Sequence, residues 1–180
     1  MIKLLIVDVD GVMTNGKKYF ARDGEVVAKG FCDKDWTAIK RFKSIGVDVV
    51  LLTGDAYNAW ILDKRAIDVV VNRGDGKHRD KALYLSEICD RFCVRIEQIA
   101  YVGDDFYDIS IMKLVGYAYC PKDSIDMVKH CENVRILGYN GGDNFLSHLF
   151  EHLESCGLIP RKSYDEISVK MYELDEKEVF

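Results

Sequence analysis

The sequence predicts an α/β fold: a doubly wound, Rossmann-like, mainly parallel sheet with a β-hairpin flap after its first strand. Short apolar runs recur along the chain and alternate with stretches whose apolar residues have helical spacing. The runs are apolar throughout, as in strands that are buried on both faces of a parallel sheet. Several of them end in an acid, a threonine or a glycine, at the point where open α/β sheets bind ligands.

The expected elements follow one another in a regular order. The strands are expected at 4–7, 47–52, 67–71, 98–102, 117–120 and 134–137, and the helices near 36–45, 56–66, 78–92, 109–114, 124–131 and 145–156. Two strand-like runs, 17–21 and 25–31, surround the turn Asp23-Gly24 and predict the hairpin. Either Asp33 or Asp35 is suited to cap the helix that follows. The segment 72–76 is expected to be a loop.

The length and charge of the chain limit its class. Residues 1–156 are expected to form one domain, and the highly charged tail 157–180 is expected to be partly mobile or to dock on a neighbouring subunit. The net charge of −5 argues against nucleic acid or an anionic membrane as the main partner. The six cysteines lack paired metal-ligand spacing, and the N-terminus does not resemble a signal peptide, so we expect a cytoplasmic protein with reduced thiols.

The first strand carries two acids at its C-terminal end. Asp8 and Asp10 follow the apolar run 4–7, and Gly11 lets the chain turn away. Side chains alternate along a strand, so we expect both carboxylates on one side. Two like charges at the end of a core strand repel each other unless a cation or a shared proton compensates them. The pair therefore indicates a functional site.

Other reactive residues are expected at the same edge of the sheet. Thr53 and Gly54 end the second strand, Asp104 and Asp105 follow the fourth, and Lys81 precedes it on a helix. Carboxylates and water are the ligands that Mg²⁺ prefers. A hydroxyl, backbone amides and an ammonium group suit a phosphoryl group. Together they predict a magnesium-dependent phosphoryl-transfer site.

Competing motifs fit less well. An EF-hand calcium loop needs glycine at its sixth position and a preceding helix, whereas Gly11 is fourth from Asp8 and follows a strand. Neither a Walker phosphate loop nor GxGxxG is present. His148 and His152 share a helix face but lack a third ligand nearby, which favours a solvated face over zinc.

The spacing of these elements resembles that of the haloacid dehalogenase superfamily of phosphohydrolases. DVDGVMT at 8–14 resembles the first motif of that superfamily, Thr53 in LLTGD the second, Lys81 the third and GDDFYD at 103–108 the fourth. The resemblance implies that Asp8 is the nucleophile that forms an aspartyl-phosphate and that Asp10 is the acid and base. It further implies that Thr53, Gly54 and Lys81 bind the phosphate. Asp8, Asp104 and the carbonyl of Asp10 would bind Mg²⁺, and Asp105 and Asp108 would support the metal and Lys81 from behind.

The lengths of the connections narrow the resemblance. Larger members insert a cap domain between the motifs, but here a hairpin and one helix separate Asp10 from Thr53, and a helix, a strand and a loop separate Thr53 from Lys81. The chain is similar to the capless subgroup that hydrolyses phosphates of eight- and nine-carbon sugar acids. That subgroup forms homotetramers in which a neighbouring subunit closes the site, which implies that the hairpin 16–31 is an interface element.

Three departures from that subgroup leave the substrate open. Trp36 replaces a usual glycine and is either a stacking surface for a sugar or a core residue. Gly141-Gly142-Asp143-Asn144 lacks the arginine of the usual GGRG. Asp55, after Leu-Thr-Gly, favours the nine-carbon group or another sugar. The alternatives are therefore a phosphatase for another phosphometabolite and a non-catalytic scaffold or regulatory domain.

Overall fold

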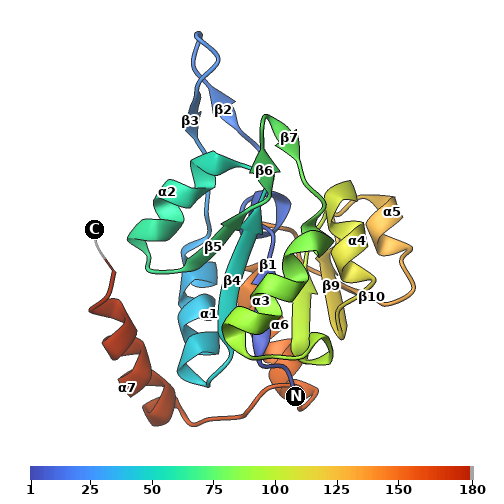
Figure 1. Cartoon of the computed structure of the whole chain (residues 1–180). Helices are drawn as coiled ribbons and strands as arrows, with labels where there is room; N and C mark the ends of the chain where they lie inside the picture. Colours follow the sequence, from blue (N-terminus) through green and yellow to red (C-terminus); the bar gives the residue numbers. More distant parts are fainter. Residues whose placement is uncertain (179–180) are drawn as a thin grey trace.

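The computed structural model describes residues 1–178 and contains a six-stranded parallel sheet (Figure 1). The strand order is β10-β9-β8-β1-β4-β5, so the chain winds outward in both directions from β1. The strands are β1 (Leu4–Val7), β4 (Asp48–Thr53), β5 (Asp68–Val71), β8 (Ile99–Val102), β9 (Tyr117–Pro121) and β10 (Val134–Leu137). This order confirms the predicted doubly wound α/β fold.

Helices cover both faces of the sheet, and each face has its own apolar core. The helices are α1 (Asp33–Ser44), α2 (Ala56–Lys64), α3 (Leu85–Phe92), α4 (Ile109–Met112), α5 (Asp126–Lys129), α6 (Phe145–Ser155) and α7 (Tyr164–Asp175). In β1, Leu5 and Val7 pack in the core with α1, α2 and α6, whereas Leu4 and Ile6 pack in the core with α3, α4 and α5. Burial on both faces explains why this strand is apolar throughout.

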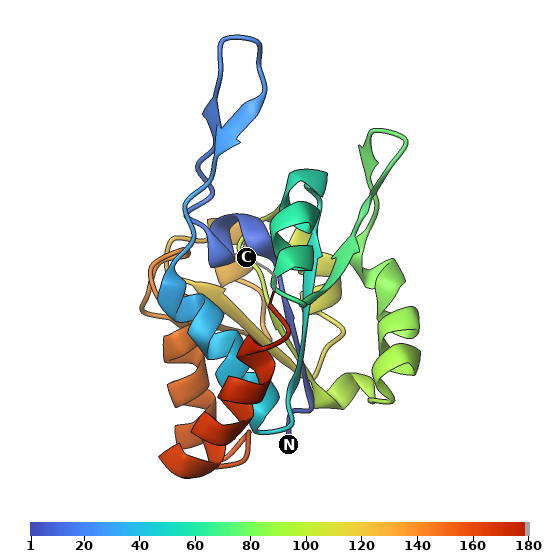
Figure 2. The same cartoon turned by 90° about the vertical axis from the view of Figure 1, so that its left-hand side faces the viewer.

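Two hairpins stand at the carboxyl edge of the sheet (Figure 2). The predicted one consists of β2 (Tyr19–Phe20) and β3 (Val26–Ala28). The second, β6 (Arg73–Gly74) and β7 (Lys77–His78), lies where we expected a plain loop. Its strands are two residues long, too short for an alternating pattern to be visible in the sequence.

The chain turns away from the sheet directly after the first strand, before Asp10. β1 ends at Val7, and Val9–Met13 form a tight helical turn, closed by a bond from the Thr14 amide to the Val9 carbonyl. Gly11 has a φ of 96°, and a Cβ there would lie 2.0 Å from Asp104 Oδ2. Asp10 belongs to this turn, so alternation along a strand does not set the direction of its side chain, although Asp8 and Asp10 line one pocket as expected.

Some helix boundaries also differ from those expected. The segment 78–92, predicted as one helix, becomes helical only at Lys81. It begins as a short 3₁₀ helix over Lys81–Tyr84, which α3 follows. Neither Asp33 nor Asp35 caps α1, because Cys32 occupies the cap position. Asp35 instead accepts the Leu146 amide at the start of α6, at 2.8 Å. The acid thus fixes one helix against another.

The charged tail folds back on the domain. Helix α7 packs along α1 (Figure 2), and Ser163 and Glu166 form a capping box at its start. Lys40 on α1 pairs with Asp175 and with Glu178, the latter at 2.9 Å. The described part of the tail is therefore a helix that docks on its own chain. Among the described residues, no helix is long and apolar enough to cross a membrane.

Candidate active site

A pocket of about 390 Å³ opens at the carboxyl edge of the sheet, between the two hairpins. Its lining combines acids, cations and two side chains that bear a hydroxyl group. These residues are Asp8, Asp10, Lys18, Phe20, Val26, Thr53, Gly54, Asp55, Arg73, His78, Lys81, Asp105, Tyr107 and Asp108. The pocket thus brings together residues from all four predicted motifs.

Lys81 lies at the bottom of this pocket and is buried. Its Nζ donates to Asp8 Oδ1 at 2.8 Å and to Asp108 Oδ1 at 2.6 Å. Burial opposes its charge, but the two carboxylates more than compensate and raise the pKa of Lys81 above its usual range. Lys81 therefore remains an ammonium ion that orients the proposed nucleophile.

Asp108 positions other groups through both of its oxygens. Oδ1 accepts the Tyr101 hydroxyl at 2.5 Å as well as Lys81, and Oδ2 accepts the amides of Asp104 and Asp105 at 2.9 and 3.0 Å. This arrangement leaves Asp108 little capacity to bind a ligand directly. Its place agrees with the supporting role that the resemblance implied.

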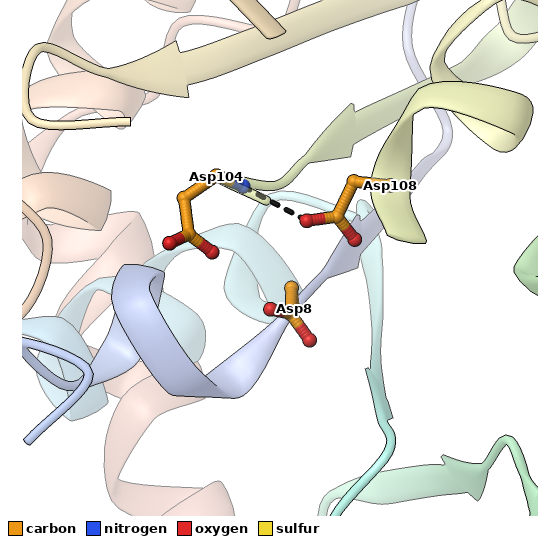
Figure 3. A group of neighbouring side chains, drawn as sticks. All are labelled: Asp8, Asp104 and Asp108. Carbon is orange, nitrogen blue, oxygen red and sulfur yellow. Dashed lines mark hydrogen bonds between the residues drawn. The ribbon is translucent and has the colours of Figure 1, made fainter. Parts of the chain in front are cut away.

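Asp8, Asp104 and Asp108 converge from the ends of two neighbouring strands (Figure 3). One oxygen from each lies within 4.8 Å of the others. Among the described residues, Asp104 Oδ1 is buried without a hydrogen-bond partner. A buried carboxylate oxygen without a donor is costly, and a hard cation would satisfy it. Asp8 and Asp104, with the oxygens of Asp108 already occupied behind them, therefore fit a divalent metal ion.

The electrostatics of these acids lead to the same conclusion. Burial, together with the charge of Asp108, raises the pKa of Asp8 to about 7 despite Lys81. Burial, together with the charges of Asp8, Asp108 and Asp105, raises the pKa of Asp104 to about 8. Both carboxylates are thus destabilised as anions in the protein alone. A cation bound between them would reverse this effect.

Asp10 lies apart from that group and faces the first hairpin. Lys29, directly after β3, donates to both oxygens of Asp10, at 2.8 and 2.9 Å. The same Nζ donates to Asp55 Oδ2 and to Asn58 Oδ1, both at 2.7 Å. The side chain of Lys29 is 0% exposed. The assignment of the Asp10 carbonyl to the metal stays a prediction.

The hydroxyl of Thr53 is oriented by its neighbours. Its oxygen accepts the Asn58 side-chain amide at 2.8 Å and the Asp55 backbone amide at 3.2 Å. With two donors on the oxygen, its proton is left to be donated into the pocket. Asp55 also caps α2 by accepting the Tyr57 amide at 3.0 Å. Asp55 thus lines the pocket, as expected, but two lysines hold its carboxylate.

Trp36 does not contact this pocket. It is 5% exposed and packs in the core, with its ring centroid 5.1 Å from that of Phe31. It lines a different cavity, between α1 and α7. The interpretation as a sugar-stacking surface is therefore wrong, because its helical spacing with Ile39 and Phe42 directs it into the core.

The sequence analysis missed Lys29, Asn58 and Tyr101, which hold the predicted site residues in place. It also missed four polar residues that line the pocket: Lys18, Arg73, His78 and Tyr107. Tyr101 lay inside an apolar run and was interpreted as core. Asn58 occupies the first turn of a helix one turn after Thr53, a spacing that places the two side chains close together. Lys29 had no such signal, because the hairpin carries it back over Asp10 from a distant point in the chain.

The fold and the site now agree with a family match. Residues 75–140, which include Lys81, Asp104 and Asp108, match the family described as haloacid dehalogenase-like hydrolase. This match confirms the superfamily that the motifs indicated.

Within this class, the chain is similar to 3-deoxy-D-manno-octulosonate 8-phosphate phosphatase KdsC of Yersinia pestis. The two are 33% identical over 123 residues, which are 68% of this chain. The chain spans 64% of the length of that relative, and of the same phosphatase from Escherichia coli K12, to which it is 29% identical.

Solved structures show the same grouping. The cobalt-bound deoxy-D-mannose-octulosonate 8-phosphate phosphatase of Haemophilus influenzae aligns with a TM-score of 0.76 at 26% identity, over 87% of this chain and 90% of that chain. The Moraxella catarrhalis phosphatase, solved with magnesium, phosphate and a KDO molecule, aligns with a TM-score of 0.74 over 86% and 87% of the two chains. Its identity of 22% shows the common fold.

Proposed function

We propose that this protein is a divalent-cation-dependent phosphomonoesterase that hydrolyses a small phosphorylated sugar. The observation that carries the proposal is Asp8 itself. Its carboxylate lies between the Lys81 ammonium, at 2.8 Å, and Asp104, in a pocket also lined by Thr53. A carboxylate held by a cation beside further phosphate-binding groups is suited to attack phosphorus.

The proposed reaction has two halves. Asp8 attacks the phosphorus atom, the bond from phosphorus to the ester oxygen breaks, and Asp10 gives its proton to the leaving alkoxide. Asp10, now ionised, takes a proton from water, whose oxygen attacks the same phosphorus and releases Asp8 and inorganic phosphate. Each half replaces a direct attack of water on an anionic ester by an easier step.

The other groups have supporting roles. Lys81 and the Thr53 hydroxyl would bind the phosphoryl oxygens, and Asp108 holds Lys81. Asp8 and Asp104, with the Asp10 carbonyl that the resemblance implies, would hold the metal ion. A Mg²⁺ ion there supplies positive charge that reduces repulsion between the carboxylate and the phosphate.

The substrate class rests on the relatives. The matched phosphatases are named for 3-deoxy-D-manno-octulosonate 8-phosphate, a phosphorylated sugar acid. We propose an eight- or nine-carbon sugar acid phosphate for this chain. A phosphatase for another phosphometabolite is the second candidate, since residues 141–144 are Gly-Gly-Asp-Asn and lack an arginine.

One experiment tests the chemistry. Phosphate release is measured from a panel of phosphorylated sugars and sugar acids, with Mg²⁺ and with a chelator. We expect turnover that requires Mg²⁺ and falls by roughly 10⁴-fold or more in Asp8→Asn. Enzyme that is quenched during turnover carries the phosphorylated aspartate, and its reduction with borohydride should convert residue 8 to homoserine. An undiminished rate in Asp8→Asn would overturn the mechanism.

A further inference from the structure

The second hairpin places an arginine at the mouth of the pocket. Arg73 on β6 and His78 on β7 are paired directly across the hairpin. A terminal nitrogen of the Arg73 guanidinium lies 2.6 Å from His78 Nε2. Both residues line the same pocket as Asp8 and Thr53. The guanidinium therefore shares a cavity with the proposed phosphate site.

His78 is held in place from two sides. Its ring stacks on Tyr107, with centroids 4.6 Å apart and an interplanar angle of 21°. It also packs against Gly54, where a Cβ atom would lie 2.3 Å from His78 Cε1. Gly54 follows Thr53 directly, so one imidazole ring separates the guanidinium from the turn at the phosphate site. Burial, and the charges of Arg73, Lys81 and Lys18, lower the pKa of His78, so the neutral ring accepts a hydrogen bond from the Arg73 guanidinium.

Within the part of the chain that the structure describes, the charge of Arg73 is not matched by an acid. Lys18 and Lys29 pair with Asp10 and Asp55, as described above. Lys81 pairs with Asp8 and Asp108. Within residues 1–178, no carboxylate lies within ion-pair distance of Arg73, and its recorded partner is the neutral His78. The pocket thus has one guanidinium available to an incoming anion.

We propose that Arg73, held by His78, binds a second anionic group of the substrate, at the end of the molecule away from the reacting phosphate. This inference rests on the proposed function and specifies its substrate class. A guanidinium binds the oxygens of a carboxylate or a phosphate through two parallel hydrogen bonds. The chemistry therefore selects a sugar that bears a carboxylate or a second phosphate over a neutral sugar phosphate.

The test is a ratio of specificities. For each variant, kcat/KM is measured on three substrates: a sugar-acid phosphate, a sugar bisphosphate and a neutral sugar phosphate of similar length. In the unmodified protein we expect an anionic substrate to exceed the neutral one. Arg73→Gln should reduce this ratio by about 10- to 100-fold, the range for hydrogen bonds to charged groups. Arg73→Lys should restore part of it.

The hairpin offers a matched control. Arg79 follows β7 and packs against Gly74, but it lines a different cavity. Arg79→Gln should leave the ratio unchanged. His78→Phe preserves a ring for stacking but removes the acceptor, and it should lower the ratio mainly through KM. The substrate with the larger loss in Arg73→Gln distinguishes a carboxylate from a second phosphate.

Three outcomes would overturn the inference. These are an equal loss on all three substrates in Arg73→Gln, an equal effect of Arg79→Gln, and no preference for an anionic substrate in the unmodified protein. If no substrate turns over, the proposed function fails separately. Calorimetry then decides the subsite: a free sugar acid should bind the unmodified protein at least tenfold more tightly than Arg73→Gln. Equal affinities would reject it.

Discussion

Lys29 binds both oxygens of the Asp10 carboxylate: its ammonium group lies 2.8 Å from one oxygen and 2.9 Å from the other. Asn58 donates to the same carboxylate at 3.1 Å. The lysine belongs to the base of the first hairpin and the aspartate to the turn after β1. The hairpin is therefore tied to the proposed acid and base of the reaction, and Lys29 is a positioning residue.

The first prediction concerns Lys29→Met. Without Lys29, the Asp10 carboxyl loses the contact that orients it, so it should transfer its proton to the leaving group less well. Hydrolysis of an alkyl phosphate depends on that proton because an alkoxide is a poor leaving group. Hydrolysis of p-nitrophenyl phosphate depends on it much less, because p-nitrophenolate leaves readily as an anion. We expect kcat/KM to fall on the order of 10- to 100-fold for a sugar phosphate, and at most a few-fold for the aryl ester.

Two variants are controls for this result. Lys29→Arg keeps a cation at the position and should recover part of the activity on the sugar phosphate. Lys17→Met removes an exposed lysine at the start of the same hairpin and should leave both substrates unaffected. Equal losses on the alkyl and the aryl ester in Lys29→Met would contradict a role through Asp10.

The second prediction concerns Asp104→Asn. Asp104 Oδ1 is the buried oxygen without a partner, and burial and neighbouring acids raise the pKa of this carboxyl. The substitution should raise the half-saturating Mg²⁺ concentration at least tenfold. It should also raise the melting temperature of the metal-free protein, because it removes repulsion with Asp8. Activity measured as a function of Mg²⁺ concentration gives the first effect, and thermal unfolding of the metal-free protein gives the second.

Asp105→Asn is the matched control for that prediction. Asp105 is the neighbouring acid, it is exposed, and its carboxylate accepts the Phe106 amide at 2.7 Å. We expect its half-saturating Mg²⁺ concentration to change much less than that of Asp104→Asn, since the exposed Asp105 carboxylate lies outside the group formed by Asp8, Asp104 and Asp108. The same shift in both variants would argue against Asp104 as a direct metal ligand.

The third prediction concerns stability and pH. Asp35 is 0% exposed, and its burial raises its pKa from 3.8 to about 6, although the Leu146 and Ser147 amides oppose the shift. A carboxyl whose pKa is raised by folding favours the folded state below pH 4, and this contribution is lost as the pH rises through 6. Relative to Asp35→Asn, the unfolding free energy should fall by roughly 2 kcal/mol between pH 4 and 7.

Urea unfolding at pH 4, 5, 6 and 7 measures this difference. Asp35→Asn keeps an oxygen that accepts the Leu146 amide, so the cap of α6 is retained. Asp33→Asn removes an exposed acid from the same helical turn and serves as the control. A difference between the unmodified protein and Asp35→Asn that is constant with pH would show that Asp35 does not titrate in this range.

The fourth prediction concerns assembly. The first hairpin exposes three apolar side chains, namely Tyr19 at 59%, Phe20 at 60% and Val27 at 58%. The resemblance to capless tetramers implies that this hairpin is an interface element, and exposed apolar groups on one element are suited to that role. We expect a tetramer by light scattering and a smaller species in Tyr19→Lys. Tyr164→Lys on α7, where the tyrosine is 79% exposed, should leave the tetramer intact.

Local patterns in the sequence were enough for much of the fold. Leu4 to Val7, Val134 to Leu137 and the start of α6 at Phe145 lie where the apolar pattern placed them. Such patterns depend on neighbours in the chain, which the sequence lists directly. The same patterns placed Thr53, Lys81 and Asp104 at one edge of the sheet, and the structure brings all three close to Asp8.

The contacts between distant segments were not predictable in this way. Asp8 and Asp10 are two residues apart, yet they have different partners, because the turn at Gly11 separates them. The first faces Lys81 and Asp104, and the second faces Lys29. Alternation along a strand does not apply once the strand has ended.

By itself, the sequence determined the class of fold, the acid pair, and a site at the carboxyl ends of the strands that suits a metal ion and a phosphate. The tertiary structure decided which acid meets which cation. It also brought Lys29 of the first hairpin against Asp10, and Arg73 of the second hairpin into the pocket that Asp8 lines. The physical reason is that local pattern fixes burial and secondary structure, whereas charge pairing depends on packing between segments far apart in the chain.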